Sequence, residues 1–312
     1  MATVEQAELP ASVEAMLRAK RPRRRMSRAR VVRYVVLIAG AVLFVAPFAY
    51  MVTASFQTQG QMFRYPPQWI PLHPTLENYT QFFQFGGSAI GRWVINSLFV
   101  ALSLTFMQTI VASLAAYTFA KRRFPFRNLL FIGFIATLMV PYQVTIIPFY
   151  LILKNIPLFG GNNIAGIGGH GWLNSYWGLI VPRIANPFSI FLIRQYMLTI
   201  PDELLDAARI DGANELTIWW RVVMPLSRPV IAATAIFAFQ FFWQELYYPL
   251  IMLSSQQLYT LPLGLTFFVQ GRQVLWTQVM AGSVLATLPL LVLFLVFQRY
   301  FVRGIALTGV KG

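Results

Sequence analysis

Long apolar segments alternate with short polar connections along most of the chain. Each apolar segment reaches the length of about 20 residues that a helix needs to cross the hydrocarbon core of a bilayer. We expect six such helices, at about residues 34–54, 93–119, 129–153, 176–198, 230–253 and 279–301. The segments lack the strict alternation of apolar and polar residues that is typical of strands in a membrane barrel. Backbone amides in hydrocarbon must be paired within their own segment, so the pattern predicts an all-α integral membrane protein.

The composition and the placement of charge extend this interpretation. Of the 312 residues, 57% are hydrophobic and 11% are charged, and the formal net charge is +15. Most basic residues lie before the first predicted helix, between the second and third, between the fourth and fifth, and after the sixth. These positions share one side of a six-helix protein, so the positive-inside rule predicts that both termini are cytoplasmic. We expect residues 1–33 to form a basic cytoplasmic tail that sets orientation or contacts anionic membrane lipid.

The positive charge does not indicate a nucleic-acid partner, because the chain has no element suited to reading bases. The sequence contains no cysteine, and its two histidines, His73 and His170, lie far apart in predicted outer loops. We therefore expect neither a disulfide framework nor a metal site.

Two outer connections and several prolines interrupt the apolar pattern. Residues 55–91 contain Pro66, Pro67, Pro71 and Pro74, which predict an irregular loop. Residues 154–175 are rich in glycine but lack the lysine and the hydroxyl residue of a phosphate-binding loop, so we interpret them as a flexible connector. Prolines at positions 141, 148, 182 and 187 predict kinks in the third and fourth helices.

A polar insert at residues 201–229 separates the fourth and fifth apolar segments. It contains all three aspartates of the chain, Asp202, Asp206 and Asp211. We expect a short helix after Pro201, since Asp202 and Glu203 would place negative charge in its first turn. The Asp211-Gly212 pair predicts the end of this helix, because glycine adopts a left-handed cap conformation without a steric penalty.

A second short helix is expected after this turn. Asn214 is suited to cap its N-terminus, and Pro225 and Pro229 are expected to end it and lead into the fifth spanning helix. Its apolar face would consist of Ile218, Trp219, Val222 and Val223. In the first helix, Leu204, Leu205, Ala207 and Ala208 would form a small apolar face that lets another surface approach closely. On composition alone, an ordinary amphipathic loop is the alternative.

The insert resembles the EAA loop of permease subunits from binding-protein-dependent ABC importers. The pattern E-A-A-x-x-D-G-A, followed at about a dozen residues by L-P-L-x-x-P, is matched by Asp206-Ala207-Ala208, Asp211-Gly212-Ala213, Met224-Pro225-Leu226 and Pro229. Two positions depart from it, because Asp206 stands for the usual glutamate and Met224 for the usual leucine. Both changes conserve charge or bulk.

Other segments resemble carbohydrate permeases of this family, over roughly residues 60–312. These segments are Pro74-Thr75-Leu76-Glu77-Asn78-Tyr79, Trp243-Gln244-Glu245 with Pro249-Leu250, Thr260-Leu261-Pro262-Leu263-Gly264-Leu265, and the tail from Gly304 to Gly312. Gln244 stands where asparagine is usual. Together they resemble the second inner-membrane permease of maltose-type importers, and glycerol-phosphate permeases share much of the pattern.

The resemblance implies a six-helix type I importer domain at residues 34–312, in which the EAA loop couples to an ATPase. It implies coupling roles for Asp206, Ala207, Ala208, Asp211, Gly212, Ala213 and Pro225. The implied partners are a paralogous permease, two ATP-binding subunits, an extracytoplasmic solute-binding protein and a sugar substrate. The chain has no G-x-x-x-x-G-K-[ST] sequence, so we expect no enzymatic activity and no cofactor in this subunit. ATP and Mg²⁺ would bind the partner ATPase.

A substrate pathway is suggested by the polar residues of the fourth and fifth helices. Glu245 is the only acidic residue in a predicted span, and ionisable residues there are expensive enough to suggest function. Gln240 and Gln244 are spaced to lie near one helix face with Glu245, and Arg183 and Asn186 are three residues apart on helix four. The alternative is a polar pair that holds helices together.

Two other classes of protein remain as alternatives. An ion-coupled secondary transporter would use Glu245 as its candidate carboxylate, but the chain has no internal repeat. An integral membrane enzyme would need a cluster of catalytic residues near a membrane face. Only the insert offers one, and its spacing fits a helix rather than a nucleophile or metal site.

Overall fold

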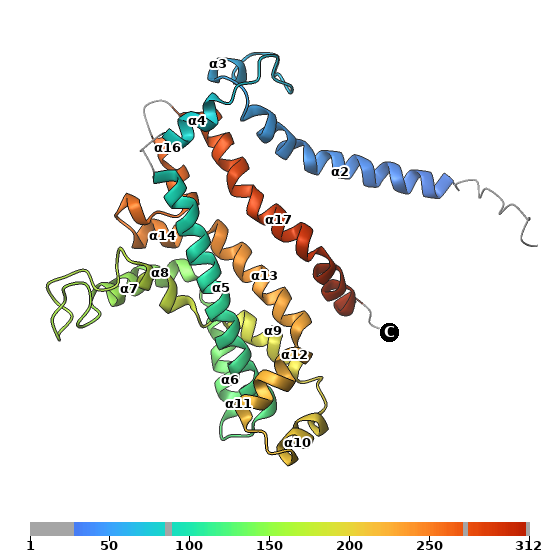
Figure 1. Cartoon of the computed structure of the whole chain (residues 1–312), viewed down its shortest axis with the longest axis vertical. Coiled ribbons are helices and arrows are strands. Elements are labelled where there is room, and N and C mark those ends of the chain that lie inside the picture. The colour runs from blue at the N-terminus through green and yellow to red at the C-terminus, as the bar shows by residue number, and fades with distance from the viewer. Residues whose placement is uncertain (1–27, 85–88, 271–273, 310–312) are drawn as a thin grey trace, which may run out of the picture. The chain divides into compact units, whose positions relative to one another are not determined.

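The computed structural model describes residues 28–84, 89–270 and 274–309, which are helical with connecting turns and no strands (Figure 1). The chain divides into two compact units, Met1–Tyr50 and Met51–Gly312. The first unit contains most of helix α2 (Arg28–Ala54), whose apolar side chains are largely exposed. This helix begins earlier than expected, so the end of the predicted tail at residues 28–33 is helical. Arginine is a good helix former, and its long side chain can lie along an apolar surface while keeping its charge in water.

The second unit contains the remaining helices. Its outer and first spanning elements are α3 (Gln59–Met62), α4 (Glu77–Gln84), α5 (Ala89–Lys121), α6 (Arg127–Ala136), η1 (Thr137–Met139), α7 (Tyr142–Lys154), α8 (Tyr176–Ile180), η2 (Val181–Arg183) and α9 (Pro187–Met197). The insert and the later elements are α10 (Asp202–Ile210), α11 (Glu215–Ile218), the π-helix η3 (Trp219–Val223), α12 (Met224–Leu226), α13 (Arg228–Gln244), α14 (Tyr247–Met252), η4 (Gln256–Leu258), α15 (Leu261–Leu265), α16 (Phe267–Gln270) and α17 (Trp276–Gly309).

In the described part of the chain, four helical segments are long and apolar enough to cross a membrane by themselves. They are Arg28–Ala54, Ile90–Lys121, Tyr176–Met197 and Trp276–Gln298. Two further pairs of helices meet the same criteria but are bent at a short break, by 103° after Met139 and by 83° after Leu226. Counting each bent pair as one span gives six. The first bend lies at Pro141, which precedes α7, and Pro182 and Pro187 occupy the first turns of η2 and α9.

The fifth apolar segment differs from the expectation of one helix over residues 230–253. Helix α13 ends at Gln244, Glu245 has an extended backbone with φ −65° and ψ 122°, and α14 starts at Tyr247. The break frees backbone groups, which are tolerated at membrane depth only where protein or a cavity satisfies them. The fifth apolar segment therefore consists of two helices joined by a break rather than one continuous helix.

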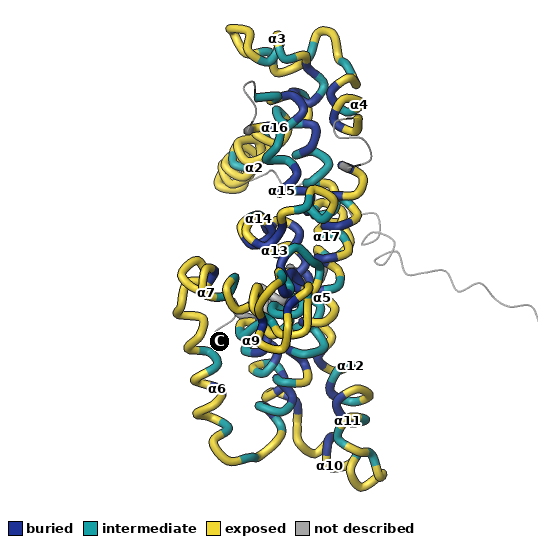
Figure 2. Tube along the Cα trace, turned by 90° about the vertical axis from the view of Figure 1, so that its left-hand side faces the viewer, coloured by how far each residue is buried: buried dark blue, intermediate teal, exposed yellow. Residues whose placement is uncertain are grey.

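Helix α5 is the centre of the second unit and packs against both α9 and α13. Towards the insert it carries Ala112, Ala116 and Ala120, which repeat every four residues and are buried against α9 and the insert. Small residues at this spacing let helices approach closely, which is how helices associate in lipid. Figure 2 shows the buried residues along α5, α13 and α14, whereas α6 and α7 are mostly exposed.

At the other end, α5 is held by hydrogen bonds to the segment that precedes α15. The Trp93 indole donates to the carbonyl of Gln256 at 2.8 Å, and the Asn96 amide donates to Gln257 and Tyr259 at 2.8 and 2.9 Å. These bonds satisfy carbonyls of the short helix η4 and of Tyr259 just after it, so side chains of α5 position the connection between α14 and α15.

The glycine-rich connection at residues 154–175 is a folded structure rather than the flexible connector expected from its composition. Asn162 is 8% exposed; its amide donates to the carbonyls of Lys154 and Ile156 at 2.7 and 2.9 Å, and its Oδ1 accepts from the Gly169 amide at 2.7 Å. A Cβ atom at Gly160 would collide with the backbone of Gly171. The glycines thus permit close backbone packing, which composition cannot distinguish from flexibility.

Substitution of Gly264 by alanine is expected to destabilise the second unit. A Cβ at this buried glycine would overlap the ring of Trp93, so α15 or the indole must move. Overpacking of this kind costs about 1–3 kcal/mol. Gly91→Ala, where no atom lies within 4 Å of the new Cβ, is the control. The measurement is the thermal unfolding midpoint in detergent, and equal midpoints for the two variants would contradict the close packing.

Candidate functional site

The polar insert begins with a helix that has a well-defined end. Helix α10 starts at Asp202, and Asp202 and Glu203 occupy its first turn as expected. At its end, the amide of Gly212 donates to the carbonyl of Arg209 and the amide of Ala213 donates to that of Ala208, both at 3.0 Å. With φ +83° at Gly212, this is the Schellman arrangement of a helix C-terminus. The turn is therefore fixed by hydrogen bonds.

The second helix of the insert starts and ends where the sequence predicts. Oδ1 of Asn214 accepts a hydrogen bond from the Thr217 amide at 2.8 Å and caps the helix. The helical path ends at Leu226, one residue after Pro225, and Pro229 lies in the first turn of α13. Proline lacks the N–H that an α-helix would use at position 225. The preceding residues, Trp219–Val223, form a π-helical turn, an adjustment that accommodates an interrupted hydrogen-bond pattern.

One side of the insert is anchored in the bundle. Leu205, Ile218, Trp219 and Val223 are buried in a cluster that includes the alanines of α5. The apolar face expected on the second helix is thus confirmed, with Val222 partly buried in the same cluster. The expectation that Leu204, Leu205, Ala207 and Ala208 share one face of the first helix is wrong in part, because Leu205 is buried and Ala208 half-buried while Leu204 and Ala207 are exposed.

The opposite side of α10 is exposed and partly apolar. Leu204 and Ala207 are exposed, and Ile210 is 87% exposed. Spaced three residues apart, they share one side of the helix, which we call the outer face of α10. Asp211 and Gly212 are exposed at its end, and Ala213 is half-buried. A contiguous exposed apolar patch, as distinct from a single exposed side chain, is a feature of surfaces that meet other proteins.

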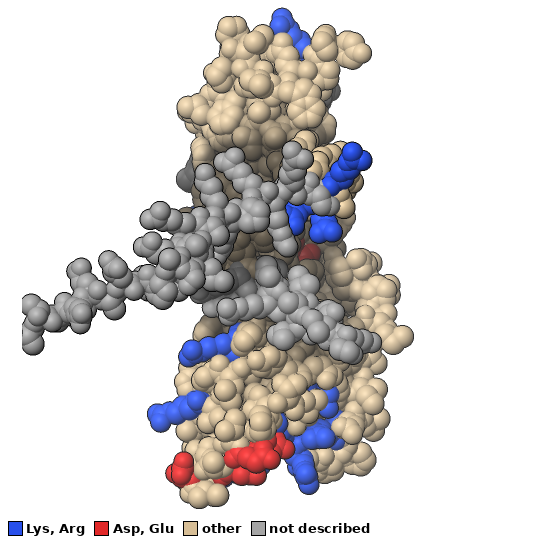
Figure 3. Space-filling model, turned by 90° about the vertical axis from the view of Figure 1, so that its right-hand side faces the viewer, with Lys and Arg blue, Asp and Glu red and all other residues tan. Residues whose placement is uncertain are grey.

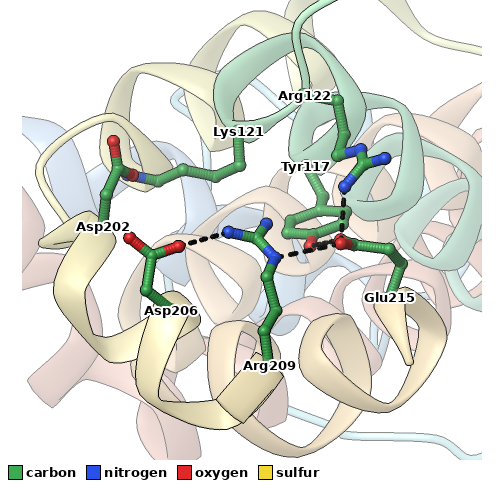
Figure 4. Close-up of polar contacts among 7 residues, drawn as sticks. All are labelled: Tyr117, Lys121, Arg122, Asp202, Asp206, Arg209 and Glu215. Atoms are coloured by element: carbon green, nitrogen blue, oxygen red, sulfur yellow. Dashed lines mark hydrogen bonds and ion pairs between the residues drawn. The ribbon is translucent and has the colours of Figure 1, made fainter. Parts of the chain in front are cut away.

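A polar network joins the insert to the end of α5 (Figure 4). The Glu215 carboxylate accepts hydrogen bonds from the Tyr117 hydroxyl, from Nη1 of Arg122 at 2.5 Å and from Nε of Arg209 at 3.1 Å. Nη1 of Arg209 also pairs with Asp206 at 2.6 Å. The bond to Glu215 raises the pKa of the Arg209 guanidinium. One carboxylate thus connects α5, α10 and α11.

Lys121 makes a second link between α5 and the insert. Its buried Nζ donates to the carbonyl of Ile200 at 2.5 Å and to Oδ1 of Asp202 at 2.7 Å. The hydrogen bond from Lys121 holds the pKa of the Asp202 carboxyl below its ordinary value. The Asp202 side chain is 75% exposed, so this pair contributes little stability by itself.

Charged residues of both signs surround these links. On the face drawn in Figure 3, acidic side chains gather at the end that carries α10, with basic side chains beside them. A polar pocket of about 400 Å³ lies between the end of α5 and α10, lined by Lys121, Arg122, Arg123, Asp202, Leu205, Asp206 and Arg209. Of the residues expected to couple, Asp206 takes part in the network, but Glu215 was not among the expected residues.

A second candidate site lies where the fourth and fifth segments are broken. Glu245 is buried, and its Oε2 pairs with Nη2 of Arg183 at 2.7 Å. The guanidinium carbon lies 4.5 Å from the ring centre of Tyr248 and 4.9 Å from that of Phe242, close enough for cation–π attraction. Arg183 and Asn186 line a pocket of about 330 Å³.

Three of the five residues expected in a substrate pathway are therefore brought together, and two are not. Gln240 and Gln244 are exposed and do not line the pocket. The expectation that they share a helix face with Glu245 is wrong, because α13 ends at Gln244 and the next residue leaves the helix. Asn186 also has a structural task, since its Oδ1 caps α9 by accepting from the Ser189 amide at 3.0 Å.

Comparison with known proteins gives a consistent assignment. Residues 108–307 match the model of the family described as "Binding-protein-dependent transport system inner membrane component". The arabinooligosaccharides transport system permease protein AraQ of Bacillus subtilis is 34% identical over 76% of this chain and 79% of its own length. The sn-glycerol-3-phosphate transport system permease protein UgpE of Yersinia pestis is 33% identical over 87% of this chain and 94% of its own.

Two solved structures share the fold. A chain of a bacterial ABC transporter involved in the import of the acidic polysaccharide alginate superposes with a TM-score of 0.76 and 21% identity, covering 89% of this chain and 99% of that one. A chain of the bacterial alginate transporter in complex with an alginate pentasaccharide-bound periplasmic protein superposes with a TM-score of 0.57 and 14% identity, covering 86% and 93%.

Proposed function

Because the chain belongs to the family of binding-protein-dependent transport system inner membrane components, we propose that it is a permease subunit of an ATP-driven sugar importer. The match to the family model over residues 108–307 carries this proposal, since it spans the insert and both candidate sites. In the proposal the subunit forms half of the translocation pathway. A permease for glycerol phosphate or another polar solute is the second candidate, favoured by the likeness to UgpE.

The insert is the proposed coupling element. Its outer face, with Leu204, Ala207 and Ile210, would enter a cleft on an ATP-binding subunit, and the adjacent polar pocket would receive a charged side chain of that subunit. Its inner side is packed on α5, α9 and α13. Closure of the ATPase dimer would thus move the insert and, through Glu215 and the buried apolar contacts, the spanning helices. This would convert ATPase closure into alternating access of the pathway.

The remaining partners follow from the family and the exposed surfaces. We propose a paralogous permease as the second half of the pathway, two ATP-binding subunits that bind ATP and Mg²⁺, and an extracytoplasmic solute-binding protein. The apolar residues exposed on α6 and α7, among them Leu129, Ile132, Val144 and Ile147, suit contact with the second permease or with lipid. Both termini would be cytoplasmic, with the basic tail near anionic lipid, and the permease domain would comprise residues 34–312 together with the helical end of the tail.

Co-purification tests the proposed function. The chain, tagged at its C-terminus and solubilised gently, is expected to bring with it an ATPase, a second permease and a solute-binding protein, identified by mass spectrometry. Uptake of solute by liposomes containing the complex is expected to require ATP. A well-folded chain that purifies alone and supports ATP-independent uptake would overturn the proposal in favour of a secondary transporter.

A further inference from the structure

The pocket beside Arg183 and Glu245 has both polar and apolar side chains in its lining but no uncompensated charge. Arg183 is the one charged residue among the described residues that line it, and its partner Glu245 lies 2.7 Å away. Both carboxylate oxygens of Glu245 are engaged, since Oε2 accepts from Arg183 and Oε1 accepts from the Tyr248 amide at 3.4 Å. The charges of Arg183 and Glu245 therefore neutralise each other before any solute binds.

The surroundings of the arginine disfavour an anionic solute. Phe241, Phe242 and Tyr248 lie with their ring centres 4.5 to 5.5 Å from the guanidinium carbon. These rings cover much of the guanidinium surface that a phosphate would need for a bidentate contact. A phosphate or carboxylate on the solute would also lie near the buried Glu245 carboxylate, and like charges at short range in a poorly solvated site repel strongly.

A second cavity continues the same wall; its lining is mostly apolar but includes one residue with a hydrogen-bond acceptor left unpaired by the described residues. It has a volume of about 280 Å³ and shares Asn186, Phe241 and Phe242 with the first. Gln108, which is 3% exposed, contributes to its lining and donates from Nε2 to Ser189 at 2.9 Å. Its Oε1 accepts no hydrogen bond from any described residue. This oxygen is buried; a hydroxyl group that reached it could donate to it, whereas an ionised phosphate or carboxylate group has no proton to give.

We infer that the two cavities form one site for an uncharged, hydroxyl-rich solute, a saccharide without phosphate or carboxylate groups. This inference rests on the proposed function and narrows its substrate class. The apolar faces of sugar rings would pack on Phe241 and Phe242, which belong to both cavities. Hydroxyl groups would bond to Gln108 and to the amide nitrogen of Asn186, which donates to no described residue. The Arg183–Glu245 pair excludes anions because its charges are already balanced.

Protection of an introduced thiol tests this inference. The chain contains no cysteine, so Thr145→Cys, at the first cavity, gives its only thiol. The complete transport complex in liposomes is treated with N-ethylmaleimide, and labelling of this chain is followed by mass spectrometry. Arabinotriose or maltotriose is expected to slow labelling at least threefold, and sn-glycerol 3-phosphate at the same concentration is expected to leave it unchanged. Ile164→Cys, at an 81% exposed position in the glycine-rich connection, should be labelled at the same rate with every solute.

Charge variants in the Thr145→Cys background supply the second readout. Glu245→Gln leaves Arg183 without its counter-charge, so sn-glycerol 3-phosphate should now slow labelling at least threefold. Arg183→Gln combined with Glu245→Gln should restore the preference for the neutral saccharide. A role for the pair that is merely structural would not move this selectivity.

Each outcome bears on the inference. Equal or stronger protection by glycerol phosphate before any charge change, or no protection by either saccharide, would overturn it. Its failure is distinguishable from failure of the proposed function, because the same liposomes report ATP-dependent uptake. ATP-dependent uptake without the expected protection by saccharides would overturn only the inference, whereas ATP-independent uptake would overturn the proposed function.

Discussion

Replacement of Glu215 by glutamine is expected to lower solute uptake by the assembled complex about tenfold while ATP hydrolysis continues. The Glu215 carboxylate bonds to Tyr117 and Arg122 at the end of α5 and to Arg209 on α10. Glutamine keeps the shape but loses the charge, so Arg122 loses the carboxylate it pairs with and Arg209 keeps only Asp206. Bonds to charged groups contribute about 1.5–3 kcal/mol when buried, and the 36% exposure of the Glu215 side chain reduces this to about 1.5 kcal/mol. Such a change corresponds to about tenfold in an equilibrium.

The measurement compares uptake with ATP hydrolysis in liposomes containing the purified complex. A loosened insert should still dock on the ATPase through its outer face, so hydrolysis persists, but its displacement should be passed poorly to α5. Glu203→Gln is the matched control, since Glu203 is exposed on α10 of the same insert and forms no ion pair with any described residue. Wild-type uptake by Glu215→Gln, or an equal loss in Glu203→Gln, would contradict a role for this network in coupling.

The sequence predicts the insert well because its determinants are local. Negative charge in the first turn of α10, the glycine stop at Gly212 and the Asn214 cap each depend on residues within a few positions of one another. Propensity and capping rules operate at this range. What these rules do not predict is the π-helical turn at Trp219–Val223, just before Pro225. That adjustment leaves no clear trace in the sequence.

The sequence does not predict which residues far apart in the chain contact each other. Glu215 could be placed in the first turn of a helix, but its contact with Tyr117 spans 98 positions of the chain. Arg183 and Glu245 could be named individually as polar residues in apolar segments, yet their pairing spans 62 positions. Gln240 and Gln244 were grouped with Glu245 by helical periodicity, which fails where α13 ends. The hydrophobic pattern predicts where the apolar segments lie, but a break inside a segment depends on packing against other helices such as α5 and α8.

Substitution of Gly212 by valine is expected to abolish most solute uptake while the complex still assembles and hydrolyses ATP. Gly212 has φ +83°, a conformation that a β-branched residue adopts only at high cost. No atom lies within 4 Å of a Cβ built at this position, so the effect would come from the backbone rather than from a collision. Valine should open the turn that holds the carbonyls of Ala208 and Arg209 and let α10 pivot against α11. Backbone strain of this kind costs about 1–3 kcal/mol. This is enough to populate a state in which α10 moves independently of α11, so that movement of the ATPase is not passed on to the spanning helices.

Gly212→Asn distinguishes a requirement for the left-handed backbone at this turn from a requirement that residue 212 carry no side chain. Asparagine is close to valine in size and projects into the same open space, but it tolerates the left-handed conformation. If the turn's backbone is what matters, Gly212→Asn should retain at least half of wild-type uptake per ATP hydrolysed while Gly212→Val falls to a few per cent. Equal failure of both variants would mean instead that the ATPase packs directly against Gly212 and admits no side chain there. Full activity of both would show that a rigid turn is not needed for coupling, and the insert would then have to act through its buried apolar contacts alone.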